Sequence, residues 1–133
     1  MNPGCAFAHP GLRTAATIAA MLLAGCAAKP FDPYDGKTVS GHGMSPYVIL
    51  EECVKVAAGE RIDYSFTSTL PVDFNIHYHE GATVIMPIVR DKTLVDGAIF
   101  AAVIPQEYCL MWEAGATGTT LDYRLRLRAP APP

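Results

Sequence analysis

Apolar and polar residues alternate along short stretches of this chain, as they do in extended strands with one buried face. Runs rich in Val, Ile, Tyr, Phe and Thr are separated by turn residues, and no stretch has a convincing 3.6-residue period. We predict seven strands, over Val48–Val56, Arg61–Ser68, Val72–His79, Thr83–Arg90, Gly97–Ile104, Tyr108–Glu113 and Thr119–Leu127. This pattern favours an all-β fold, a small antiparallel two-sheet sandwich.

Residues two apart on a strand share a face, so the alternation also predicts which side chains form the core. Those expected to point inward are Ile62, Tyr64, Phe66, Val72, Phe74, Ile76, Tyr78, Leu121, Tyr123, Leu125 and Leu127. Tyr108 and Trp112 are also expected to pack inside. The side chains expected on the outer faces are Asp73, Asn75, His77, His79, Asp122, Arg124, Arg126 and Arg128.

The N-terminal segment has the composition of an export signal. The run Thr14–Ala24 carries no charge and is about 11 residues long, whereas a membrane-spanning helix needs roughly 20. Leu23-Ala24-Gly25-Cys26 follows directly and resembles the lipobox of bacterial lipoproteins. The resemblance implies cleavage after residue 25 and attachment of fatty-acyl chains such as palmitate to Cys26. Ala27 resembles the residues that permit transfer to the outer membrane, which predicts its periplasmic face as the location.

The mature chain is expected to consist of three parts. Residues 26–46 are rich in Pro and Gly and read as a lipidated cysteine with a flexible tether, residues 47–128 as the β-sandwich domain, and residues 129–133 as a disordered tail. Arg13 is the only charged residue of the signal, so its removal changes the net charge from −3 to −4. This acidic balance argues against nucleic acid as a partner and leaves the acyl chains as the membrane anchor.

Two of the four cysteines, Cys53 and Cys109, remain after Cys5 leaves with the signal and Cys26 is lipidated. An even pair in an oxidising compartment predicts a disulfide. It would close a loop of about 57 residues and contribute roughly 4 kcal/mol by the chain-entropy model. The alternative is a pair of buried free thiols.

A series of short motifs between Val48 and Leu127 resembles the GOLD (Golgi dynamics) β-sandwich of eukaryotic secretory-pathway cargo receptors. The motifs, in order, are Glu52-Cys53, Gly59, Tyr64-Ser65-Phe66, Val72-Asp73-Phe74-Asn75-Ile76, Gly97-Ala98-Ile99-Phe100 and Tyr108-Cys109-Leu110-Met111-Trp112. In that family, too, an early cysteine pairs with a late one. The resemblance implies a jelly-roll-like sandwich that recognises proteins and performs no chemistry.

The sequence His77-Tyr78-His79-Glu80 is the strongest candidate for ligand chemistry. Two imidazoles at positions i and i+2 of a strand can bind one divalent or copper ion, and Glu80 can add a carboxylate. A copper site would recruit further ligands from His42 and Met44, or from two other methionines, Met86 and Met111. The alternatives are that both methionines fill the core, and that the histidines lie on a partner-facing strand with hydrogen bonds to Asp73 and Asn75.

No nucleophile elbow, phosphate-binding glycine loop or Cys-x-x-Cys motif is present, so we do not expect an enzyme. The predicted function is a lipid-anchored, non-catalytic binding module. Its proposed binding face, centred on Asp73, Asn75, His77 and His79, would meet another envelope protein. The alternative is a periplasmic metal-binding protein that uses His77 and His79.

Overall fold

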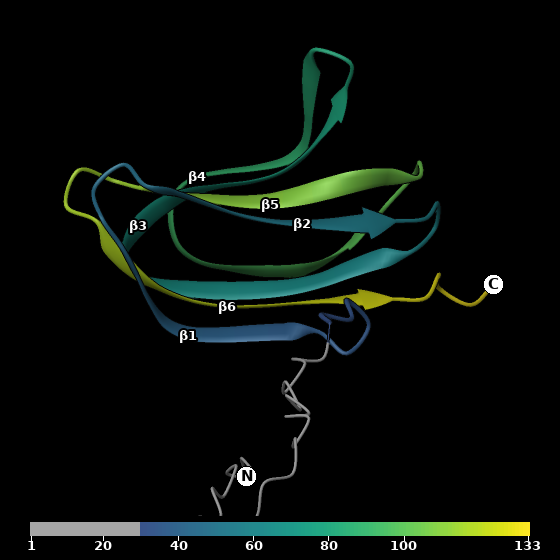
Figure 1. Cartoon of the computed structure of the whole chain (residues 1–133), viewed down its shortest axis with the longest axis horizontal. Coiled ribbons are helices and arrows are strands. Elements are labelled where there is room, and N and C mark those ends of the chain that lie inside the picture. The colour runs from purple at the N-terminus through teal and green to yellow at the C-terminus, as the bar shows by residue number, and fades with distance from the viewer. Residues whose placement is uncertain (1–29) are drawn as a thin grey trace, which may run out of the picture.

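The computed structural model describes residues 30–133, and all the regular structure in that range is β-strand (Figure 1). The strands are β1 (Lys37–Met44), β2 (Ile49–Val56), β3 (Arg61–Glu80), β4 (Thr83–Ala101), β5 (Gln106–Ala114) and β6 (Thr119–Arg128). In this part of the chain no helix is long and apolar enough to cross a membrane. The predicted signal peptide, Cys26 and Ala27 lie outside the described residues.

Strand β3 organises the sheet because it pairs with three other strands. Its first half pairs with β6 and its second half with β5, and β4 follows nearly the whole of its opposite edge. Strands β1 and β2 pair with β6 and β5, so the order is β1-β6-β3-β5-β2, with β4 beside β3, and every pairing is antiparallel. The sheet curls into a half-barrel, because β3 carries both halves through one continuous strand (Figure 1).

The core lies on the inner side of this curl. The side chains predicted to point inward are buried, including those of Ile62, Tyr64 and Phe66. The one exception is Tyr78, which is half-buried. Trp112 of β5 joins the two halves: its ring lies 4.9 Å from that of Tyr123 and 5.4 Å from that of Phe74. The predicted inward faces and the predicted core positions of Tyr108 and Trp112 are therefore confirmed.

The prediction of seven strands was wrong, because two pairs of expected strands are each continuous. Arg61–Ser68 and Val72–His79 both belong to β3, while Thr83–Arg90 and most of Gly97–Ile104 belong to β4. Gly97 was expected to begin a strand, but it lies within β4 and allows close approach to β3. A Cβ at Gly97 would lie 3.0 Å from Cβ of Ser65 and 3.1 Å from the Tyr64 carbonyl oxygen.

The predicted tether is also partly wrong, because β1 lies within residues 26–46. It pairs with β6, and its last residue, Met44, is buried in the core. The glycines that suggested a flexible segment serve the strand instead: Gly41 has φ +67° in a bulge between Val39 and His42. At the other end, Ala129 in the predicted tail accepts a hydrogen bond from Nε of Arg61.

Candidate functional site

The outer face of strands β2, β5 and β3 carries the predicted disulfide. Cys53 and Cys109 are directly opposite each other on β2 and β5, with Cα atoms 4.0 Å apart and their sulfurs bonded. The disulfide is therefore confirmed, and the alternative of two free thiols is wrong. Cys53 is exposed and Cys109 is buried, so the bond can be reached from the Cys53 side.

His77 lies beside this disulfide, with its Cα opposite that of Cys109. Its ring is buried, and both nitrogens have partners. Nδ1 lies 2.8 Å from Oδ1 of Asn75, and Nε2 lies 3.2 Å from Oε1 of Glu51. Because the amide oxygen of Asn75 can only accept, Nδ1 carries a proton. Nε2 faces the carboxylate of Glu51.

The structure brings together only part of the predicted metal set. The rings of His77 and His79 are 5.3 Å apart on one face, but His79 is exposed and Nε2 of His77 faces Glu51. Glu80 is the last residue of β3, at the hairpin turn opposite Thr83. An ion at His77, His79 and Glu80 stays a prediction.

Sequence reasoning missed Glu51 as a neighbour of His77, because the two residues come from different strands. The spacing carried only part of the signal, and the pairing of strands supplied the rest. Glu51 and Cys53 share a face of one strand, and the disulfide partner Cys109 is adjacent to the predicted third strand.

The methionines proposed for a copper site are dispersed. Met44 is buried in the core, whereas Met86 is 48% exposed on β4. The alternative that Met86 fills the core was wrong, because its side chain lies on the exposed part of β4. Met111 lies opposite Asn75 and is half-buried.

The predicted binding face has a buried centre. Asn75 and His77 are both buried, while Asp73 and His79 are exposed. The carboxylate of Asp73 accepts a hydrogen bond from the backbone N–H of Lys92, which has φ +48° at the bend of β4. Asp73 thus holds the bend in place, and the surface beside it is formed by β4.

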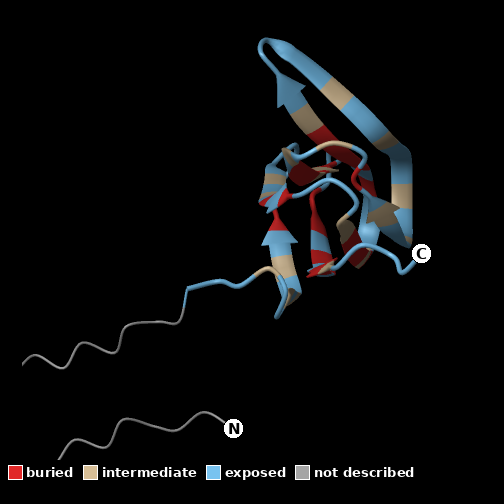
Figure 2. Cartoon of the chain, turned by 90° about the vertical axis from the view of Figure 1, so that its right-hand side faces the viewer, coloured by how far each residue is buried: buried red, intermediate tan, exposed pale blue. Residues whose placement is uncertain are grey.

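Strand β4 is an edge strand of 19 residues without a single buried side chain (Figure 2). Its outer face presents an apolar stripe of Val84, Val89, Val95 and Ile99, each between 44% and 64% exposed. Pairing places these residues opposite outward-facing residues of β3. On the inner face, Ile85, Ile88 and Phe100 are only half-buried. The outer face of β4 is therefore apolar, whereas its inner face has apolar residues towards both ends and the Arg90–Asp96 ion pair between them.

A groove of about 260 Å³ adjoins the apolar stripe at Val95. Ser65 and Thr67 of β3 contribute to its lining, as do Asp122 and Arg124 of β6. The groove thus places polar side chains of the neighbouring strands next to the exposed apolar residues of β4.

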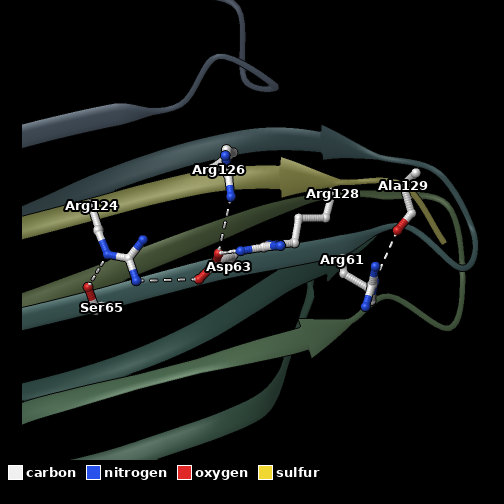
Figure 3. A network of polar contacts seen from close by, with 7 residues as sticks. All are labelled: Arg61, Asp63, Ser65, Arg124, Arg126, Arg128 and Ala129. Atoms are coloured by element: carbon white, nitrogen blue, oxygen red, sulfur yellow. Dashed lines mark hydrogen bonds and ion pairs between the residues drawn. The ribbon is translucent and has the colours of Figure 1, made fainter. Parts of the chain in front are cut away.

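The arginines of β6 were predicted to face water, and the structure gives them a common partner, Asp63 (Figure 3). Asp63 is 6% exposed on the outer face of β3. Arg128 donates to its carboxylate from Nε at 2.8 Å, and Arg124 and Arg126 each approach within 3.8 Å. Three cations around one buried carboxylate make a structural cluster that joins β3 to β6.

A second polar cluster spans the open side of the half-barrel. Glu52 of β2 forms an ion pair with Lys37 of β1 and accepts a hydrogen bond from the hydroxyl of Tyr123 on β6. Burial, and then the hydrogen bond and charge of Glu52, raise the pKa of Tyr123. Glu52 thus links the two ends of the curled sheet.

The sequence matches no protein-family model and no curated protein.

Proposed function

We propose that this chain is a lipid-anchored, non-catalytic interaction module of the bacterial envelope. Its β4 edge binds an extended segment of another envelope protein. The observation that carries the proposal is the exposure of β4: a long edge strand with an apolar outer face and no buried side chain. Exposed apolar strand edges promote pairing with other chains. Adding a strand there would satisfy the free backbone groups and cover apolar side chains together.

The segment Leu94–Ala101 is the part of β4 best suited to accept a strand. Pro87 lacks a backbone N–H, and the bend at Lys92 interrupts the edge between the two halves of β4. From Leu94 to Ala101 there is no proline and Asp96 is the only charged residue. Val95 and Ile99 lie on the outer face there, with the groove alongside Val95.

The anchoring part of the proposal is supported by the sequence Leu23-Ala24-Gly25-Cys26. Acyl chains on Cys26 would hold the domain at the membrane. The presence of Ala27 supports a location on the periplasmic face of the outer membrane. A membrane-tethered domain meets its partners at high local concentration, so one short added strand can provide sufficient affinity.

We further propose that the two ends of the curled sheet act as the layers of a small jelly-roll-like, GOLD-like sandwich. The packing of Trp112 of β5 against Tyr123 of β6, which lie on opposite sides of β3 in the sheet order, supports this. The order of motifs from Glu52-Cys53 to Tyr108–Trp112 supports a role in protein recognition.

Site-specific photo-crosslinking of the full chain in intact bacterial envelopes tests the proposal. The photoreactive residue replaces Leu94, which is 47% exposed. We expect one adduct with a different envelope protein. The amount of this adduct should fall at least about tenfold in an Ile99→Lys variant, because a cation at an apolar contact is costly to desolvate. Ile49→Lys on β2 is the matched control, since Ile49 is 53% and Ile99 51% exposed.

The control variant should leave the adduct unchanged. An adduct with the mass of two copies of this chain would make β4 a self-association surface and overturn the proposed partner. Absence of any adduct, or equal loss in the Ile49 and Ile99 variants, would overturn the role of β4.

A further inference from the structure

We propose that reduction of the Cys53–Cys109 disulfide creates a zinc site on the outer face of β2, β5 and β3. The ligands are the two thiolates, the Nε2 nitrogen of His77 and the carboxylate of Glu51. This inference is independent of partner binding by β4, because none of the four residues belongs to that strand.

The proximity of three of these groups, with His77 beside one of them, is the first observation. The sulfurs of Cys53 and Cys109 and a carboxylate oxygen of Glu51 all lie within 4.8 Å of one another. Nε2 of His77 lies 3.2 Å from Oε1 of Glu51. Strands β2 and β5 therefore bring two sulfurs and one carboxylate together, and β3 places the His77 nitrogen beside that carboxylate.

This donor set suits zinc. Zn²⁺ is bound tetrahedrally by thiolate, imidazole and carboxylate, and a Zn–S bond is about 2.3 Å long, which places two thiolates roughly 3.8 Å apart. Rotation about the Cα–Cβ bonds of two facing cysteines can produce this separation after reduction. The backbone pairing of β2 with β5 can remain as it is.

The hydrogen bond from His77 to Asn75 is the second, independent observation. Metal-binding histidines commonly donate the other ring N–H to a fixed acceptor, which orients the ring and leaves a lone pair for the metal. Nδ1 of His77 donates to Oδ1 of Asn75 at 2.8 Å, and Nε2 points at a carboxylate. A metal ion at Nε2 would also be within reach of the Glu51 carboxylate.

The redox step is an ordinary thiol–disulfide exchange with a dithiol oxidoreductase as reductant. Its thiolate attacks the sulfur of Cys53, the exposed residue of the pair, the Cys53–Cys109 bond breaks, and Cys109 leaves as a thiolate that takes a proton from solvent. The second thiol of the reductant resolves the mixed disulfide, so two electrons and two protons reach this chain and the reductant ends as a disulfide. Zinc then displaces the two thiol protons.

Zinc titration of the purified full chain against a chromogenic chelator tests the inference, with and without prior reduction by a water-soluble phosphine. The phosphine takes up one oxygen from water and leaves both cysteines as thiols. We expect the reduced protein to bind one Zn²⁺, and the oxidised protein to bind it at least about 100-fold more weakly, because two of four ligands are then bonded to each other. With Co²⁺, the reduced protein should show thiolate-to-cobalt charge-transfer absorption.

Variants assign the ligands. His77→Ala and Glu51→Ala should each weaken zinc binding by the reduced protein, and Asn75→Ala should weaken it about 10–100-fold as an outer-shell residue. His79→Ala is the matched control: its imidazole is on the same face but exposed, and its loss should change affinity less than about threefold.

Circular dichroism distinguishes a folded reduced protein from an unfolded one. If the reduced chain unfolds without metal, zinc should restore the β-sheet spectrum of the natural sequence but not that of His77→Ala. Failure of the reduced protein to bind zinc, equal binding by His77→Ala, or no restoration of an unfolded reduced chain would each overturn the inference.

Discussion

The guanidinium of Arg128, at the end of β6, donates through Nε to the buried carboxylate of Asp63, near the start of β3, at 2.8 Å. Arg124 and Arg126 approach the same carboxylate from β6 at 3.8 Å. The arginine side chains remain 40–56% exposed, so they keep most of their hydration, whereas the Asp63 side chain is 7% exposed. The free-energy cost of removing charge from water in this cluster is therefore mainly that of the Asp63 carboxylate.

Replacement of Asp63 by alanine is expected to lower the free energy of unfolding by about 1–3 kcal/mol, the range for hydrogen bonds to charged groups. The exposed arginines can turn to solvent, which limits the loss. Urea denaturation followed by the fluorescence of Trp112, the only tryptophan of the chain, measures it. Asp91→Ala at the exposed bend of β4 is the control and should stay within about 0.5 kcal/mol. Equal effects of the two substitutions would contradict a structural role for the cluster.

Replacement of both Cys53 and Cys109 by alanine is expected to cost about 4 kcal/mol, because the unfolded chain regains the freedom of a long loop. That is a large part of the stability of a small domain. Denaturation curves of the natural sequence and the double variant provide the measurement. A reducing agent should lower the midpoint of the natural sequence and leave that of the double variant unchanged. The opposite pattern would mean that the disulfide does not constrain the chain.

Stability should decline between pH 10 and 12. Burial, and then the charge and hydrogen bond of Asp96, raise the pKa of Tyr64 from 10.0 to about 12. The folded chain thus holds this proton more tightly than the unfolded chain. The contribution is complete below pH 10 and is lost as the pH rises toward 12. Denaturation midpoints across this range should fall less steeply for Tyr64→Phe, while Tyr47→Phe, at an exposed position, should follow the natural sequence. Identical slopes for both variants would refute the assignment.

Replacement of Cys26 by serine is expected to abolish lipid attachment, because the thiol is the acceptor that the lipobox presents. Mass spectrometry of the mature protein should show acyl chains on the natural sequence and none on the variant. Fractionation should find the natural sequence with membranes, since one or more acyl chains supply the hydrophobic contact. Unchanged membrane association and mass in Cys26→Ser would contradict lipid anchoring.

Much of the fold follows from local alternation. Residues such as Ile62, Tyr64 and Phe66 reveal their common face because strand geometry repeats every two residues. The pairing of Cys53 with Cys109 followed from counting cysteines. The continuity of β3 and β4 did not follow, because Pro71 and Gly97 interrupt the local pattern. At Pro71 the partner of β3 changes from β6 to β5 and the register with β4 shifts, whereas Gly97 stays paired with Ser65. Strand β1 was hidden for the same reason, since its glycines are tolerated only because β6 supplies a partner.

The sequence by itself determined that this chain folds as antiparallel strands with a known inner face and one cross-link, because these properties depend on the order of side chains along a strand. Only the tertiary structure decided that Glu51 meets His77, that Asp63 gathers the arginines of β6, and that β4 is left uncovered. Each of these depends on which strands become neighbours and on which edge remains free. Those outcomes are set by long-range pairing and by the curvature of the whole sheet.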